Sequence, residues 1–172
     1  MDVDMTGASS TTYNKWNAVC MSYDAALTLD NTKFSMDGTG LATEAHGIYM
    51  AGRGRNELNV NNHSTLTINN CFNAIAWDGV DGGNEGSTYF INITDGSTFT
   101  ADGNNGGIIG RESLDVLVDN SNLTVTNCTD RGNWEGRSGF NGADVKIVNG
   151  STANISGCLL YTSPSPRDKR QS

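Results

Sequence analysis

The chain has 172 residues and a formal net charge of −8 at pH 7, and only 36% of its residues are hydrophobic. With 11 Lys and Arg against 19 Asp and Glu, it lacks the basic surface that binds nucleic acid or anionic membranes. No apolar run approaches the roughly 20 residues that a membrane-spanning helix needs. The composition therefore predicts an acidic chain with no nucleic-acid partner and no membrane insertion.

A seven-residue pattern recurs along the chain, and it reads Asp or Asn, any residue, Ser or Thr, any residue, apolar, small or polar, apolar. The side chain of Asp or Asn can hydrogen-bond the backbone two residues on, which favours a tight corner between strands. The Ser or Thr at the third position recurs in the next copy 24 to 33 residues later. The copies are Asp30–Met36, Asn62–Ile68, Asp95–Ala101, Asp119–Val125 and Asn149–Ile155.

Each copy lies between two further short apolar elements. Alternating apolar residues precede it, and another short apolar segment follows its Ser or Thr by 11 to 16 residues. Val3 and Ala18–Cys20 fit the same order near the start of the chain. The preceding pairs are Leu27/Leu29, Leu58/Val60, Ile91/Ile93, Val116/Val118 and Val145/Ile147, and the following segments are Gly47–Met50, Ala74–Trp77, Gly107–Gly110 and Asn133–Gly136.

This order predicts an all-β chain built as a right-handed parallel β-helix, a solenoid of about five coils with three short strands each. Period-2 alternation bounded by Asn, Asp and Gly is typical of strands, and no segment has a sustained helical period. Stacked coils bury their interior against one another, which explains the low hydrophobic content. A β-sandwich or barrel is the alternative, because short strands separated by turns fit those folds too.

The repeats resemble those of right-handed, pectin-lyase-like β-helix proteins, and most of all the adhesin-type repeats of large secreted or wall-anchored proteins of gut bacteria. The segments Asp115–Cys128 and Ala143–Gly157 carry this resemblance. It implies a structural or binding segment at the cell surface or outside the cell, with a polysaccharide or a host-surface glycan as partner. The alternative is a fragment of a polysaccharide lyase or glycoside hydrolase on the same fold.

The composition changes after Gly157, and both prolines of the chain follow it. The string from Cys158 to Asp168 resembles a translated adapter used in preparing sequencing libraries. We therefore expect residues 1–157 to be a single β-helix repeat fragment, truncated at both ends, and residues 158–172 to be a non-native, disordered tail. A natural Ser/Pro-rich linker is the alternative.

The candidate catalytic residues come from aligning the third strand of successive coils. Counting three residues on from Ile48, Ile75, Ile108 and Trp134 gives a column of Ala51, Asp78, Arg111 and Arg137. In the enzymes that the repeats resemble, arginine neutralises a uronate and an acid assists the chemistry. An ordinary surface ion-pair ladder is the alternative, and the polygalacturonase signatures are absent from the sequence.

Weaker candidates are two tryptophans, a group of acids and two cysteines. Trp77 and Trp134 could stack on sugar rings or pack inward. Asp78, Asp81 and Glu85 in a glycine-rich loop could bind calcium, although their spacing matches no known calcium motif and a solvated loop explains them too. No other cofactor is expected. Cys71 and Cys128 should stack two coils apart as buried thiols, with the amides of Asn70 and Asn127 bonding the turn backbone.

Overall fold

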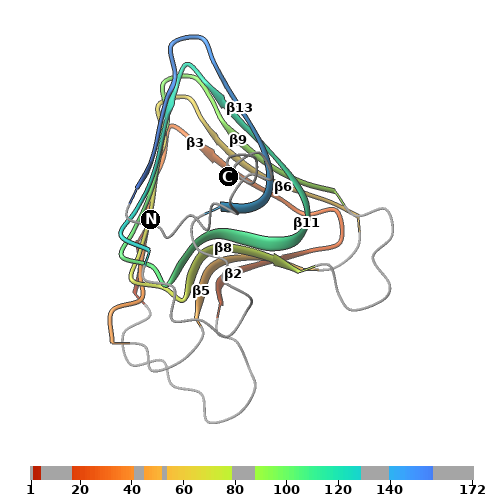
Figure 1. The fold of residues 1–172 in the computed structure, drawn as a ribbon, viewed down its shortest axis with the longest axis vertical. Helices are drawn as coiled ribbons and strands as arrows, with labels where there is room; N and C mark the ends of the chain where they lie inside the picture. The colour runs from red at the N-terminus through yellow and green to blue at the C-terminus, as the bar shows by residue number, and fades with distance from the viewer. Residues whose placement is uncertain are drawn as a thin grey trace, which may run out of the picture.

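The computed structural model describes residues 2–4, 17–40, 45–51, 54–78, 88–128 and 140–156. Within these ranges the chain forms only β-strands, which wind around a common axis and enclose a triangular cross-section (Figure 1). The paired strands of the described part are all parallel to each other. The all-β parallel solenoid predicted from the sequence is confirmed.

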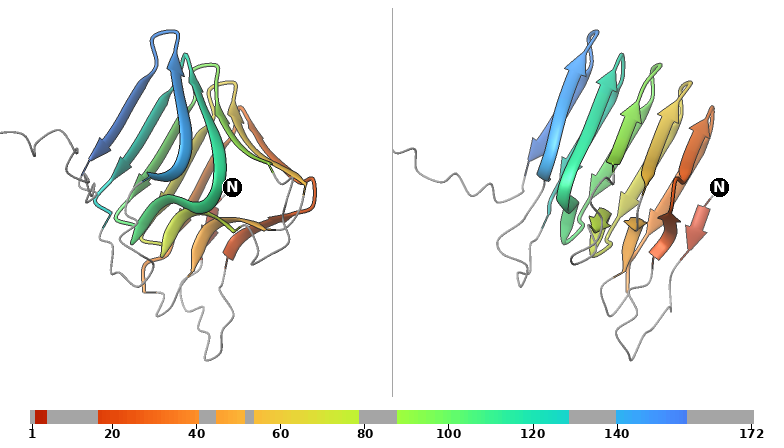
Figure 2. Two further views of the ribbon diagram at one scale, coloured as in Figure 1. Left: turned by 45° about the vertical axis from the view of Figure 1, so that its right-hand side comes forward. Right: turned by 90° about the vertical axis from the view of Figure 1, so that its right-hand side faces the viewer.

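One side of the triangle is a six-stranded sheet, which we call face A. Its strands pair without a register shift, and the coils lie side by side along the axis (Figure 2). Five of the six strands contain the apolar half of one copy of the repeated pattern, and β1 is the exception. The strands in spatial order are β1 (Asp2–Asp4), β4 (Lys33–Asp37), β7 (Thr65–Asn69), β10 (Thr98–Asp102), β12 (Asn122–Thr126) and β14 (Thr152–Ser156).

The other two sides, faces B and C, join into one sheet because β11 (Gly106–Asp119) runs from one into the other. Its first residues pair with β8 and its last residues with β9. β13 (Phe140–Val148) pairs along β11 on both sides of a register shift. Face B also contains β2 (Asn17–Ser22), β5 (His46–Ala51) and β8 (Asn73–Asp78), and face C contains β3 (Ala26–Asp30), β6 (Arg55–Asn61) and β9 (Thr88–Ile93).

The expected count of about five coils with three short strands each is slightly off. About three turns are built of three separate strands, namely β2–β4, β5–β7 and β8–β10. In the later part of the chain, the long strands β11 and β13 each replace two short strands. The sequence 106–119 has no Asx-rich break between its two apolar parts, so one strand continues through the bend.

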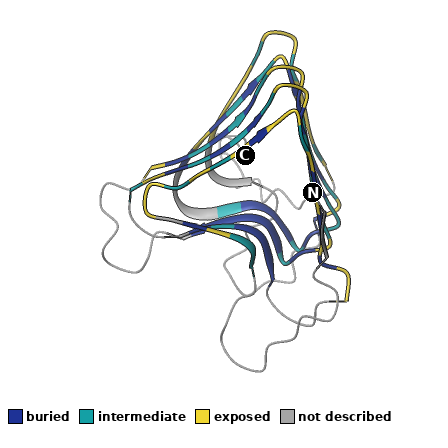
Figure 3. Cartoon of the chain, turned by 180° about the vertical axis from the view of Figure 1, so that it is seen from behind, coloured by how far each residue is buried: buried dark blue, intermediate teal, exposed yellow. Residues whose placement is uncertain are grey.

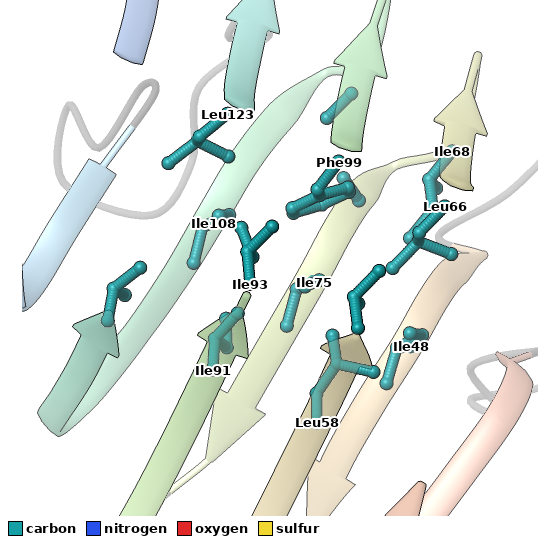
Figure 4. Packing of buried hydrophobic residues seen from close by; sticks show 14 of the residues in the cluster. Ile48, Leu58, Leu66, Ile68, Ile75, Ile91, Ile93, Phe99, Ile108 and Leu123 are labelled. Atoms are coloured by element: carbon teal, nitrogen blue, oxygen red, sulfur yellow. The ribbon is translucent and has the colours of Figure 1, made fainter. Parts of the chain in front are cut away.

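The core is made of inward apolar side chains, about one residue in every two along a strand. Figure 3 marks the buried residues along the strands. In β7 and β10 the buried and half-exposed residues alternate strictly, as the period-2 pattern predicts. Equivalent residues of successive coils stack in columns, such as Leu66, Phe99 and Leu123 (Figure 4). A coil therefore gains its apolar contacts from the coils above and below it.

A ladder of serine hydroxyls holds the corner between faces C and A. The N–H of Thr32 donates to Oγ of Ser64 at 3.0 Å, and the N–H of Ser64 donates to Oγ of Ser97 at 3.1 Å. The N–H of Ser97 continues to Ser121 and that of Ser121 to Ser151. The Ser or Thr of the repeated pattern therefore links neighbouring coils. The corner itself is formed by residues with left-handed backbone, namely Asn31, Asn62, His63, Asp95, Gly96, Asn120, Asn149 and Gly150.

Replacing Ser97 with alanine should lower the free energy of unfolding by about 1–2 kcal/mol. The side chain of Ser97 is fully buried, and its hydroxyl accepts from the N–H of Ser64. Ser35→Ala is the matched control, because Ser35 is exposed on face A, and it should change the free energy by less than about 0.5 kcal/mol. Urea unfolding measures both. Equal effects would show that the ladder does not stabilise the corner.

Replacing Asn56 with leucine should raise the free energy of unfolding by about 1–2 kcal/mol. Asn56 is 0% exposed, and among the residues that the structure describes neither polar atom of its amide has a hydrogen-bond partner. It stands in register with Tyr89, whose other neighbour is Leu114, so an apolar side chain suits this column. Asn59→Leu is the control, because the Asn59 side chain faces outward and accepts a bond from Asn92. A Tm of the Asn56 variant below that of the parent would contradict the prediction.

Candidate functional site

The outward side of face A is a regular polar surface. Neighbouring strands stand about 4.8 Å apart, and outward residues follow each other along a strand at about 6.7 Å. Five threonine hydroxyls on this surface have no hydrogen-bond partner in the described part of the chain, namely those of Thr65, Thr67, Thr98, Thr100 and Thr124. The columns are Lys33, Thr65, Thr98, Asn122 and Thr152; Ser35, Thr67, Thr100, Thr124 and Asn154; and Asp37, Asn69, Asp102, Thr126 and Ser156.

Two aspartates form an acidic margin along one edge of face A. Asp37 accepts from the hydroxyl of Thr39 at 2.6 Å and from the amide of Asn70 at 3.0 Å, and these bonds lower the pKa of its carboxyl group. Asp102 accepts from Thr126 at 2.6 Å and from Asn127 at 2.8 Å, which lowers its pKa in the same way. The margin therefore stays negatively charged at neutral pH, and it disfavours a polyanionic partner.

These bonds correct one expectation about the asparagines. The amides of Asn70 and Asn127 were expected to bond the turn backbone, but both donate to aspartate side chains of the preceding coil. Both asparagines do adopt left-handed backbone, with φ of 55° and 53°. No local pattern indicates the aspartate partners, because they stand 33 and 25 residues earlier in the chain.

Face C has a second outward cluster, around Phe90. The guanidinium carbon of Arg55 lies 3.9 Å from the centre of the Phe90 ring, and Arg55 also pairs with Glu57. Beside them, the amide of Asn92 donates to Oδ1 of Asn59 at 2.8 Å. Sequence analysis missed this cluster, although the alternation in β9 predicts that Phe90 faces outward when Tyr89 faces inward.

Part of the strand alignment from which the catalytic column was predicted is present in the structure, while the catalytic role itself stays a prediction. Ile48 pairs with Ile75 and Ile75 with Ile108, as the alignment predicted. Asp78 pairs with Ala51, and Arg111 directly follows Gly110, which pairs with Trp77. Asp78 is the last residue of β8, and Arg111 lies in β11 one residue beyond the last pair between these two strands; the structure describes only these strand positions.

The register expected for Trp134 is wrong. The residue that pairs with Ile108 in the following strand is Phe140, six positions later. The alignment that gave Arg137 its place in the column is therefore wrong, because β13 begins later in the chain than that alignment assumed. Trp134 and Arg137 themselves lie outside the described residues.

The remaining candidates are placed only in part. Trp77 is 2% exposed and lies in the core, so its side chain has the inward orientation that was the alternative to sugar stacking. Asp81 and Glu85 lie outside the described residues, as does the expected tail 158–172. Within the described ranges, no three His, Cys, Asp or Glu side chains gather as a metal site would require.

Cys71 and Cys128 are buried cysteines that form no disulfide within the described residues, and they lie at one corner of the coil, two coils apart. Asn104 occupies the corner position of the coil between them, where its Oδ1 accepts from the N–H of Cys71 at 2.9 Å and its amide donates to Ile68 at 2.8 Å. Burial, assisted by the charge of Asp37, raises the pKa of the Cys71 thiol to about 11. Both the burial and the position agree with the sequence prediction.

Comparisons of the chain with protein-family models, with curated proteins and with solved structures find no match. The described residues also contain no helix long and apolar enough to cross a membrane. The parallel β-solenoid fold is therefore supported by the structure alone, and no comparison supports a relationship to pectin-lyase-like or adhesin-type proteins.

Proposed function

We propose that this chain is a structural and binding segment of a bacterial secreted or cell-surface β-helix protein of the adhesin type, and that face A contacts a glycan. The carrying observation is the array of threonine hydroxyls on face A that have no partner in the described part of the chain. The resemblance of the repeats to adhesin-type repeats supports the extracellular setting.

The geometry of face A favours an extended, uncharged polysaccharide. Threonine is stiff at χ1, so its hydroxyl is held in place before binding and loses little entropy on binding. The columns run across the coils, so a chain of sugars lying along the solenoid meets the same groups at each coil. The acidic margin of Asp37 and Asp102 disfavours polyuronates.

The test is binding of the full chain to immobilised neutral and acidic polysaccharides. We expect retention on at least one neutral polymer. The triple variant Thr67→Val, Thr100→Val and Thr124→Val should bind it at least about tenfold more weakly, because each of the three lost hydrogen bonds costs about 0.5–1.5 kcal/mol. Valine keeps the β-branched shape, so the variant should fold as the parent does.

Thr28→Val with Thr88→Val is the matched control on face C, and it should leave binding unchanged. Equal retention of the triple variant and the parent would contradict a role of face A. Preferential binding to polyuronates would contradict the electrostatic argument.

The second candidate function is a polysaccharide lyase or hydrolase. It is supported by the presence of Asp78 in β8 and Arg111 in the neighbouring strand β11, because an acid and an arginine on one face suit attack on a uronate. The full chain is assayed for depolymerisation of pectin and alginate, together with Arg111→Ala. Cleavage by the parent that the Arg111→Ala variant loses would support an enzymatic function. If neither protein cleaves these polymers, the enzymatic function is rejected for them.

A further inference from the structure

The acidic margin of face A alternates between carboxylate and amide over three successive coils. Asp37, Asn69 and Asp102 stand in register in β4, β7 and β10, so an amide lies between two carboxylates. Neighbouring strands are about 4.8 Å apart, so the carboxylate recurs after two coils, or about 9.6 Å. A ligand that lies along the margin therefore meets the same charged group at every second coil.

Each of the two carboxylates has one oxygen left for a ligand. The side-chain bonds that hold Asp37 and Asp102 all go to Oδ1 of each carboxylate. In the described part of the chain, no side chain donates to Oδ2 of either aspartate. The two charged acceptors are therefore fixed before a ligand arrives, which lowers the entropy lost on binding. A hydroxyl group that donates to a carboxylate also makes a stronger bond than one that donates to a neutral oxygen.

Asn69 gives the middle coil of the margin the opposite hydrogen-bonding character. Its Oδ1 atom is enclosed and has no partner among the described residues. The amide nitrogen also donates to no described group, so it is the group that Asn69 can offer to a ligand. Along the solenoid the margin therefore presents an acceptor, a donor and an acceptor.

The register of face A favours a ligand that lies along the solenoid axis. From β4 to β14 the strands of face A pair without a shift, and the coils lie side by side (Figure 2). A polymer along the axis keeps contact with the margin and with the neighbouring hydroxyl column of Ser35, Thr67 and Thr100. A polymer that followed one strand would meet only three outward side chains before it left the face.

A neutral β-1,4-linked hexopyranose polymer has the alternation that this margin requires. Each sugar lengthens the polymer by slightly more than one coil spacing, so three sugars stay in step with three coils. Successive sugars of the extended two-fold ribbon are turned over. One edge of the ribbon therefore presents the vicinal hydroxyls of every second sugar, which donate to a carboxylate, and the hydroxymethyl oxygen of the sugar between, which accepts from an amide. The α-1,4-linked polymer of the same sugars winds into a helix and loses this order.

We propose that the glycan on face A is a neutral β-1,4-linked polymer with one sugar per coil, and that Asp37 and Asp102 bind the vicinal hydroxyls of alternate sugars. Asn69 contacts the hydroxymethyl group of the sugar between them. This inference rests on the proposed function of face A and names its ligand class. Because the two aspartates lie in the first and third of three successive coils, a trisaccharide is the shortest ligand that reaches both.

The test titrates the full, isotope-labelled chain with cello-oligosaccharides of increasing length and follows the amide chemical shifts. The affinity should rise about tenfold from cellobiose to cellotriose, because the trisaccharide engages the second carboxylate. Maltohexaose contains the same sugars in α-1,4 linkage, and it should bind at least about tenfold more weakly than cellohexaose.

Asp102→Asn should lower the affinity for cellotriose to about that for cellobiose. Asparagine keeps the shape of the side chain, but one of its two terminal groups is an amide donor in place of a charged acceptor. Asp115→Asn is the matched control, because it makes the same change in charge at an exposed position of face C and should leave each affinity unchanged. Circular dichroism checks that both variants have the parent's strand content.

Three outcomes would overturn this inference and leave binding of another neutral glycan by face A intact. They are equal affinities for cellohexaose and maltohexaose, a cellotriose affinity that Asp102→Asn does not change, and retention of a neutral polymer by a chain that binds no cello-oligosaccharide. A chain that binds no neutral polymer at all would overturn both this inference and the proposed function.

Discussion

Replacing Phe99 with alanine should lower the free energy of unfolding by about 3–5 kcal/mol. Phe99 is 0% exposed and stands between Leu66 and Leu123 in one column of face A, in the middle of the core (Figure 4). Its removal leaves a cavity between two coils whose backbones are fixed by parallel pairing on both sides, so the site cannot collapse fully. Urea or thermal unfolding followed by circular dichroism measures the loss.

Phe90→Ala is the matched control for this prediction. Phe90 faces outward on face C, where its ring contacts the guanidinium group of Arg55. We expect a loss of about 1 kcal/mol, the size of a surface cation–π contact. Similar losses for the two variants would mean that Phe99 is not enclosed between coils, and the stacked column would be wrong.

Replacing Gly38 with alanine should cost about 3 kcal/mol, near the upper end of what overpacking costs. A Cβ atom at Gly38 would lie 2.5 Å from the carbonyl oxygen of Asn70 and 3.0 Å from the Cα atom of Cys71. Both are backbone atoms of the next coil, so no side chain can move aside. The N–H of Gly38 donates to the carbonyl of Asn69 at 2.9 Å, and the strain should weaken this bond too.

Gly40→Ala separates this steric effect from backbone strain. Gly40 has a φ of 80°, and no atom of the described residues lies within 4 Å of its Cβ position. Alanine there should cost about 1 kcal/mol, through the left-handed backbone alone. If the Gly40 variant were the less stable of the two, the close approach of coils at Gly38 would be contradicted.

The repeated pattern predicted the strands because it combines two local signals. Alternation fixes which residues face inward, as in Leu66 and Ile68, and an Asx or Gly corner ends each strand. The equal order of these signals in each repeat also predicted which strands pair, for example Ile48 with Ile75 and Ile108. Fold class and most of the register therefore follow from the sequence.

Other features depend on contacts between distant coils, which no local pattern reveals. The bonds from Asn70 to Asp37 and from Asn127 to Asp102 join residues that are separated by a whole coil. The slip from Trp134 to Phe140 arises because β13 begins later in the chain than the alignment assumed. The outward Phe90 cluster could have been found, because alternation alone assigns its side.

The central claim is that the chain is a parallel solenoid whose strands pair one coil apart. The most direct measurement is the set of amide and Hα nuclear Overhauser contacts in an isotope-labelled sample of the full chain. The account predicts contacts between Thr67 and Thr100 and between Thr100 and Thr124, with parallel-strand geometry. Antiparallel contacts between strands that are consecutive in the chain, such as β3 and β4, would contradict it and indicate a β-sandwich or barrel.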